Sequence, residues 1–253
     1  NSRFSEAQLH RLVADAEGTQ LNLQQLWQVT QRITAYYQQH GYEYSRAYLP
    51  QQNLSQGIVK INVLEAYYDK SQIDNQSRTQ DWLIQQTLEP LKQGERINSN
   101  KMQHQLKLLN RLNGVTTRNI LTPGADVGSS QLNVEVQNTA LLSGYMGADN
   151  FGNEYSSRVR GTAGLSAEHF AGVGDALSLD LMTAGERMNY ARVGYAFTFT
   201  GAGTRAGVSY SYLDYELGKD LKSIGAEGSA AQSSIFISQP VLLSNHAEVL
   251  LSL

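Results

Sequence analysis

The chain has 253 residues, of which 41% are hydrophobic and 17% charged, with no Cys and a formal net charge of −3. The lack of Cys excludes disulfide scaffolds and thiolate metal sites, and the slightly acidic balance argues against nucleic-acid binding, which usually needs a basic surface. No run of about 20 apolar residues occurs, so the sequence predicts no transmembrane helix. The composition does not exclude a transmembrane β-barrel, because the alternating strands of a barrel keep the average hydropathy low.

Residues 1–138 are rich in Gln and combine helical periodicity with short strands. Two residue pairs have the spacing of a capping box and predict the starts of two helices, Ser5 with Gln8 and Asn22 with Gln25. On the second helix, Trp27, Ile33 and Tyr37 are expected in the core. Two strands are predicted to follow, over residues 44–49 and 58–63.

The same order of elements recurs further along the chain. The pattern predicts a strand, two helices and two more strands, at residues 66–73, 80–91, 98–110, 115–121 and 132–136. We therefore predict a tandem β-α-α-β-β module of about 70 residues. The first domain covers residues 1–65 and the second residues 66–138. Because the first copy has no opening strand, we expect the chain to begin inside a domain.

From residue 139 onward, the hydrophobic pattern takes the period of two that β-strands show, and about six or seven strands are predicted. Gly becomes frequent in these residues, and Gln becomes rare, with only Gln232 and Gln239. This alternation fits a soluble β-sandwich. It also fits an outer-membrane barrel with apolar side chains toward lipid and polar side chains toward the lumen. In a barrel, the charges predicted to face the lumen are Arg158, Arg160, Asp180, Arg192 and Glu248.

Three features of residues 139–253 favour the barrel. The strands are about 10 residues long, as a tilted span of a bilayer requires. The polar face carries Gly, Ser, Thr and charged residues, and the aromatic residues gather near strand ends as in an interfacial girdle. Open sheet edges cannot persist in lipid, and bacterial barrels have an even number of at least about eight strands. Because the pattern still alternates at Leu253, we expect these residues to be the amino-terminal part of a longer barrel.

Several short sequence motifs indicate a more specific protein family. In the first module, SRAYLPQQ at residues 45–52 and VLE at residues 63–65 are similar to the first POTRA domain of haemolysin-activator-type exporters. In the second module, NRL at residues 110–112, LTPG at 121–124 and GSSQLNV at 128–134 are similar to the second POTRA domain. The whole chain thus resembles the POTRA-plus-barrel transporters of two-partner secretion, in the superfamily that also holds outer-membrane assembly factors.

The resemblance implies an α+β fold of tandem POTRA domains followed by the first strands of a transmembrane antiparallel β-barrel. The family pattern leads us to expect about 16 strands in the full barrel, within the bacterial range. One residue departs from the pattern, because Ala66 follows Glu65 where the family usually has Gly. We do not recognise the family's plug helix or lumen loop in this sequence, so it gives no prediction about gating.

The resemblance also implies protein export. Periplasmic POTRA domains would capture the amino-terminal secretion domain of a large unfolded exoprotein, such as a haemolysin, adhesin or contact-dependent toxin, and the barrel would pass it outward. A free sheet edge can bind an extended chain by strand addition. The candidate site is the edge strand of the first module and its loop: Arg46, Tyr48, Leu49, Pro50, Gln51 and Gln52. Alternatively, these residues only shape a strand and a turn, with Pro50 ending the pairing.

No enzyme, cofactor or metal site is predicted, since the sequence has no HExxH spacing and no G-x-S-x-G or P-loop motif. The expected partners are the exoprotein and outer-membrane lipid, with no nucleic acid. We expect residues 1–138 in the periplasm and a monomeric barrel in the outer membrane. The lumen charges could line a polypeptide path or only a water-filled interior. Two other functions stay open, a barrel-assembly factor of the same superfamily and a soluble α+β/β-sandwich binding protein.

Overall fold

The computed structural model describes residues 2–54, 57–153, 155–185, 187–218, 225–245 and 247–253. Contacts divide the chain into two compact units. The first unit contains residues 1–73, 90–104 and 119–134, and the second contains residues 74–89, 105–118 and 135–253. The second predicted domain contributes to both units, so the domain limits after residues 65 and 138 stay a prediction.

Both helices of the first module begin where the sequence predicts. Helix α1 (Glu6–Arg11) has a complete capping box between Ser5 and Gln8, and helix α2 (Leu23–Gln39) has one between Asn22 and Gln25. A short 3₁₀ turn, Ala14–Ala16, lies between the two helices. These caps satisfy backbone N–H groups that a helix start leaves without partners.

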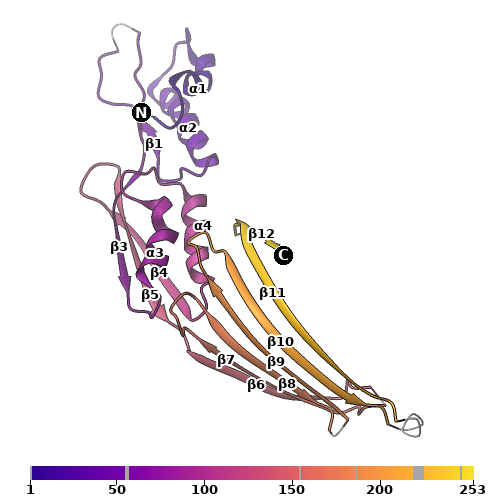
Figure 1. Cartoon of the computed structure of the whole chain (residues 1–253). Helices are drawn as coiled ribbons and strands as arrows, with labels where there is room; N and C mark the ends of the chain where they lie inside the picture. Colours follow the sequence, from indigo (N-terminus) through magenta and orange to yellow (C-terminus); the bar gives the residue numbers. More distant parts are fainter. Residues whose placement is uncertain (1, 55–56, 154, 186, 219–224, 246) are drawn as a thin grey trace. The chain divides into compact units, whose positions relative to one another are not determined.

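The strands of the first module are shorter than the sequence predicts. Strand β1 (Arg46–Tyr48) pairs antiparallel with strand β2 (Asn62–Leu64), and α2 lies against β1 (Figure 1). The buried core of this module contains Ile33, Tyr37, Tyr42 and Ala47. It is packed against the partly buried Phe4, Leu9, Val13, Ile61 and Val63.

One core prediction on α2 is wrong, because Trp27 is 59% exposed. The buried positions of α2 are Val29, Thr30, Ile33, Thr34 and Tyr37. The hydroxyl of Thr30 donates to the backbone O of Leu26, which lets a polar residue take a buried position.

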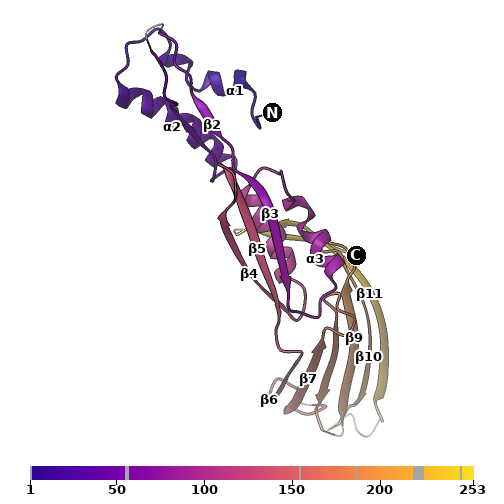
Figure 2. The same cartoon turned by 90° about the vertical axis from the view of Figure 1, so that its left-hand side faces the viewer.

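The second module has the predicted β-α-α-β-β order. Its elements are β3 (Tyr67–Asn75), α3 (Asp81–Leu88) with a 3₁₀ turn at Glu89–Leu91, α4 (Ser99–Asn110), β4 (Val115–Pro123) and β5 (Ser129–Asn138). The three strands form a sheet in the order β3-β5-β4, which Figure 2 shows, so β4 is an edge strand. Among the residues described, no helix is both long and apolar enough to cross a membrane.

The remaining described strands form a single sheet in chain order (Figure 1 and Figure 2). They are β6 (Leu142–Asp149), β7 (Arg160–Glu168), β8 (Ala176–Thr183), β9 (Met188–Thr198), β10 (Arg205–Glu216), β11 (Glu227–Leu243) and β12 (Glu248–Ser252). Each strand pairs antiparallel with the next, and β6 and β12 form the two edges. One antiparallel meander of seven described strands is expected for the start of a barrel, whereas a sandwich needs two facing sheets.

The register sorts the side chains of this sheet into two faces. Leu165 lies opposite Leu179, which lies opposite Val193, so apolar residues form rows across strands. One position further along β8, Asp180 lies opposite Arg192 on the other face. Because side chains alternate along a strand, one face is mainly apolar and the other mainly polar.

Candidate functional site

An open groove lies between helix α2 and strand β1. It has a volume of about 690 Å³ and is lined by Leu23, Gln24, Trp27, Thr30, Ala47, Tyr48 and Leu49. On the helix side, Leu23 is 73% exposed and Trp27 is 59% exposed; on the strand side, Tyr48 is 44% exposed. Neighbouring exposed apolar side chains of this size make the groove a candidate binding surface.

Strand β1 forms the outer edge of this groove, since among the described strands it pairs with β2 alone. The N–H of Ala47 donates to Oγ1 of Thr34 at 3.0 Å, so α2 reaches over the edge at this point. Hydrogen-bond directions alternate along an antiparallel strand, and the backbone groups of Arg46 and Tyr48 therefore point toward β2.

The structure separates the residues that the sequence predicts for this site. Tyr48 and Leu49 line the groove. Arg46 and Gln51 are exposed and are not among the groove residues, and Pro50 follows β1 after Leu49 in a half-buried position. A binding role for each of these residues stays a prediction.

The carboxamide of Gln52 is engaged within the first module. Its Nε2 donates to the backbone O of Lys60 at 2.8 Å, and its Oε1 accepts from the backbone N of Lys60 at 2.7 Å. This reciprocal pair resembles one rung of a β-ladder. A contact between Gln52 and a bound chain would first have to break it.

Two residues of the groove were missed as site residues in the sequence. Leu23 and Trp27 are four positions apart and therefore share one face of the first turns of α2. The buried positions of the helix begin only at Val29. An apolar pair ahead of the core-facing positions is the signal that could have identified the groove.

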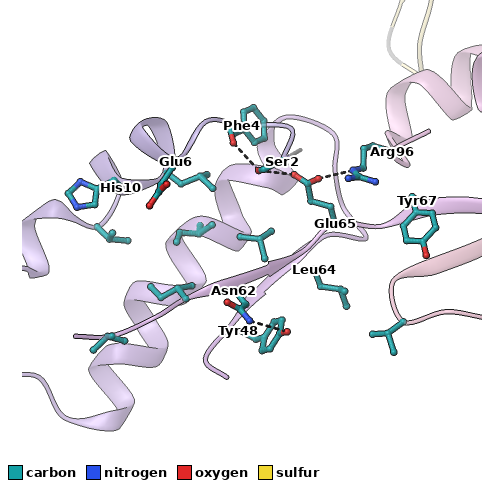
Figure 3. Close-up of a pocket in the computed structure, with 17 residues that line it drawn as sticks. Ser2, Phe4, Glu6, His10, Tyr48, Asn62, Leu64, Glu65, Tyr67 and Arg96 are labelled. Carbon is teal, nitrogen blue, oxygen red and sulfur yellow. Dashed lines mark hydrogen bonds and ion pairs between the residues drawn. The ribbon is translucent and has the colours of Figure 1, made fainter. Parts of the chain in front are cut away.

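A second groove, of about 660 Å³, lies along β2 and α1, and Glu65 is one of the residues that line it. Figure 3 shows the Glu65 carboxylate between Ser2 and Arg96. Glu65 Oε1 accepts from the hydroxyl of Tyr37 at 2.7 Å and from the N of Arg3 at 2.6 Å, and Oε2 accepts from Arg96 Nε at 2.7 Å. The side chain of Glu65 is only 8% exposed. One buried carboxylate thus connects helix α2, the backbone at Arg3 and the segment that precedes α4.

These contacts shift two pKa values. Burial by itself raises the pKa of the Glu65 carboxyl, but the hydrogen bonds from Tyr37, the Arg3 backbone and Arg96 outweigh it, and the pKa lies below its usual value. Burial, reinforced by the bond to Glu65, raises the pKa of Tyr37 to about 12. At neutral pH, Tyr37 therefore donates and Glu65 accepts.

A second contact in the same unit joins the end of α2 to the start of α4. Gly41 has a φ of +84°, and a Cβ on it would lie 2.9 Å from the side-chain nitrogens of Asn98 and Asn100. The N of Ser99 donates to the O of Gly41 at 2.8 Å. Both the backbone conformation and the space require Gly here. We call the contacts of Glu65 and Gly41 the joint.

Charged residues share the polar face of the β6–β12 sheet. Asp180 lies opposite Arg192 and accepts a hydrogen bond of 3.3 Å from the hydroxyl of Tyr145. Arg160 pairs with Asp149, with Nε 2.9 Å from Oδ1. These residues can form a polar, ion-paired surface, and its orientation toward a lumen stays a prediction.

Two predicted lumen charges have other surroundings. Arg158 lies in the loop before β7, so strand alternation does not orient its side chain, and its place on a lumen face stays a prediction. Glu248 is the first residue of β12 and forms an ion pair with Arg111, the residue after α4. The sequence pattern alone did not indicate this partner.

The turn between β7 and β8 contacts segments of the second module that belong to the same unit. His169 is buried with a φ of 66°; its Nδ1 lies 3.2 Å from Asn138 Oδ1 and its Nε2 lies 3.3 Å from Thr79 Oγ1. Asn138 Oδ1 also accepts from the N of Arg78 at 3.0 Å, which makes it an acceptor and places a proton on His169 Nδ1. The buried Asp175 carboxylate accepts three backbone N–H groups of this turn, those of Phe170, Ala171 and Val173.

Two further turns at this end of the sheet contact the helices. The N of Gly201, between β9 and β10, donates to Gln86 Oε1 on α3 at 2.7 Å. Between β11 and β12, the O of Ser244 accepts from Lys107 Nζ on α4. We call the contacts of these three turns with the second module the rim contact.

Comparisons with known proteins give a family for the first module. Residues 1–66 match the family described as POTRA domain, ShlB-type. This range contains the α2–β1 groove and Glu65.

Relatives of known name match most of the chain. The heme/hemopexin transporter protein HuxB of Haemophilus influenzae is 28% identical over 244 residues, which cover 96% of this chain and 43% of HuxB. The outer membrane transporter CdiB of Dickeya dadantii is 27% identical over 61% of this chain and 27% of its own length. The hemolysin transporter protein ShlB of Serratia marcescens is 28% identical over 68% of this chain and 32% of its own length. The chain spans less than half the length of these relatives.

Solved structures show the same fold. CdiB from Escherichia coli matches with a TM-score of 0.75 and 23% identity, covering 96% of this chain and 46% of that one. BamA from Haemophilus ducreyi matches with a TM-score of 0.54 and 18% identity, covering 95% of this chain and 46% of that one. The predicted fold, POTRA modules followed by the first strands of an antiparallel barrel, is confirmed.

The comparisons also confirm the predicted resemblance to two-partner secretion transporters of the haemolysin-activator type. They confirm the predicted location as well, an outer-membrane protein with a periplasmic POTRA domain.

Proposed function

We propose that this relative of the two-partner secretion transporters captures an unfolded exoprotein through its periplasmic modules and exports it through its barrel. The observation that carries the proposal is the apolar groove beside edge strand β1, with Leu23 and Trp27 exposed in the part of the chain that matches the ShlB-type POTRA family. The relatives are named as transporters of hemolysin and of heme/hemopexin. The proposed role is binding and transport, without catalysis.

Capture by this groove uses two kinds of contact. An extended chain that lies along β1 gains main-chain hydrogen bonds at the strand edge, which tolerate many sequences. Its apolar side chains enter the groove between Trp27 and Tyr48, which adds selection by size and polarity. A folded protein presents few free strands, so this mode of binding favours an unfolded partner in the periplasm.

Export uses the two faces of the β6–β12 sheet. The apolar face, with rows such as Leu165, Leu179 and Val193, suits contact with outer-membrane lipid. The face with Asp180 and Arg192 suits the wet lumen of a closed, monomeric barrel. Paired charges there let a polypeptide slide past without one strong binding site. No nucleic acid takes part in this proposal.

The test is secretion of a candidate exoprotein that is co-expressed with the full-length transporter. Replacing Leu23 and Trp27 by Ser removes the apolar groove surface, and we expect about tenfold less exoprotein in the medium, because buried aromatic anchors dominate such interfaces. The matched control is Trp82→Ser on α3, a similarly exposed Trp outside the groove.

Unchanged secretion, with equal transporter in the outer membrane, would overturn the capture site. The barrel-assembly alternative predicts a different result. Deleting the transporter would then lower the amounts of other outer-membrane barrels, while the exoprotein would still be secreted.

A further inference from the structure

Each module places a helix side chain on a backbone N–H of its edge strand. In the first module, the N of Ala47 donates to Thr34 Oγ1 at 3.0 Å, and both residues are buried. In the second module, the N of Thr117 on β4 donates to Asn110 Oδ1 of α4, also at 3.0 Å. The hydroxyl of Thr117 donates to the same oxygen at 2.9 Å. We call these two contacts the edge clasps.

The two edge clasps use different side chains, Thr34 and Asn110, but they bind equivalent strands of the two modules, β1 and β4. Strand β1 is the edge of the first sheet, and β4 is an edge of the β3-β5-β4 sheet. A free sheet edge is a template for any extended chain, and proteins limit this by covering the edge. Asn110 belongs to the NRL motif at residues 110–112, which the proposed export function leaves without a role.

A clasped N–H is unavailable to a captured strand. Along β1, backbone groups alternate in direction, so Ala47 carries the groups that point away from β2. Thr34 takes the N–H of Ala47, while the apolar groove beyond it is lined by Trp27, Tyr48 and Leu49. The outward N–H of β1 is therefore already bonded, and the groove beside it is apolar.

We propose that Thr34 is a specificity-determining residue, which sets where an extended segment of the transported polypeptide can pair with β1. The segment places its apolar side chains in the groove, and it can bond the N–H of Ala47 only by displacing the hydroxyl of Thr34. Asn110 holds the N–H of Thr117 on β4 of the second module in the same way. This inference rests on the proposed capture function and adds a residue that limits strand pairing with the first module.

The test compares Thr34→Val with Thr30→Val in the full chain. Both changes remove one buried hydroxyl of α2 at the same volume, but Thr30 Oγ1 donates within the helix, to the O of Leu26 at 2.9 Å. Thr34→Ser keeps the hydroxyl. The first measurement is hydrogen exchange of the Ala47 amide, which we expect to become about tenfold faster in Thr34→Val only.

The second measurement is binding of the purified amino-terminal secretion domain of the co-expressed exoprotein, kept unfolded in dilute urea and followed by Trp27 fluorescence. With the clasp removed, we expect binding about threefold to tenfold tighter, and Thr34→Ser should behave as the wild type. Unchanged Ala47 exchange, or faster exchange with unchanged affinity, would overturn the inference. If the clasp responds but no form binds the probe, the clasp holds and the capture function fails.

Discussion

The Glu65 carboxylate accepts a hydrogen bond of 2.7 Å from the hydroxyl of Tyr37, while its other oxygen lies 2.7 Å from Arg96 Nε. Tyr37 lies on α2, and Arg96 precedes α4. A carboxylate that is only 8% exposed thus connects two helices through charge-assisted bonds. The VLE motif at residues 63–65 therefore has a structural role at the joint, separate from substrate capture.

Removing the charge of Glu65 should weaken the joint. In Glu65→Gln, the amide Oε1 accepts less strongly and its NH₂ group faces the donor Arg96, so we expect a loss of about 2 kcal/mol in the free energy of unfolding. The measurement is urea unfolding followed by helical circular dichroism. It reports on the two modules, because every helix of the described residues lies before residue 139.

The matched control is Asp15→Asn, which removes an exposed ion pair with Arg32. Its urea midpoint should not change measurably, because exposed pairs contribute little. If Glu65→Gln and Asp15→Asn lowered the free energy of unfolding equally, burial would not explain the strength of the Glu65 contacts.

The same carboxylate predicts a pH dependence. The pKa of Glu65 is lower in the folded chain than its usual value of 4.5, so the unfolded chain binds more protons over the intervening range. The stabilisation is complete above pH 4.5 and is lost as the pH falls through the folded pKa. We expect the difference between wild type and Glu65→Gln to be constant from pH 7 to 5.5 and to shrink below pH 4.5. A difference that stays constant down to pH 3 would contradict this assignment.

His169 predicts an acid sensitivity of the rim contact in a different pH range. Burial lowers its pKa from 6.5, against the nearby carboxylates of Asp175 and Glu168 and with the help of Arg78. A His with a lowered pKa stabilises the fold above pH 6.5, and this stabilisation is lost as the pH falls below 6.5. The Gln80 amide, which donates to the O of Gly172 at 2.8 Å, should therefore exchange faster at pH 5.5 than at pH 7.5 after correction for the intrinsic rate.

The control for this pH effect is His169→Asn. Asn tolerates the positive φ of 66° and does not titrate. It should make the corrected exchange rate of Gln80 independent of pH in this range. If the variant keeps the wild-type pH dependence, another group controls the turn.

The fold was predictable where the signal is local. The Ser5–Gln8 and Asn22–Gln25 pairs fix the helix starts by themselves, and both capping boxes are present. The alternation of residues such as Leu177, Leu179 and Leu181 gives the strands because the side-chain period is two in any sheet.

The site was harder to predict because it depends on what packs against each helix face. Trp27 and Tyr37 look alike in a helical pattern, but only Tyr37 has a sheet and α1 residues around it. Thr30 and Thr34 take buried positions because their hydroxyls have partners, which a hydrophobicity pattern cannot show. The rim contact joins residues distant in sequence, such as His169 and Thr79, and no short motif encodes it.

Gly201 tests how closely the rim contact is packed. A Cβ on this residue would lie 2.5 Å from the backbone C of Gln86 and 2.6 Å from the N of Thr87, and helix backbone cannot give way cheaply. We expect Gly201→Ala to cost about 1–3 kcal/mol of the contact's stability and to speed hydrogen exchange in α3. Gly161→Ala is the control, because its new Cβ would meet only the Thr183 methyl at 3.6 Å. Equal exchange in the two variants would show that the turn does not press on α3.

The ion pair between Arg111 and Glu248 predicts an unequal response to charge reversal. Arg205 lines the same small cavity as Arg111. Glu248→Arg therefore brings a third guanidinium group next to those of Arg111 and Arg205. In Arg111→Glu, by contrast, Arg205 lies beside two carboxylates, that of Glu248 and the new one at position 111. Since both partners are 40–50% exposed, each effect should be about 0.5–1 kcal/mol. We expect faster hydrogen exchange of residues 247–253 in Glu248→Arg than in Arg111→Glu, and recovery in the double reversal. Equal effects of the single changes would show that Arg205 does not take part, and no recovery in the double reversal would show that the ion pair does not hold β12.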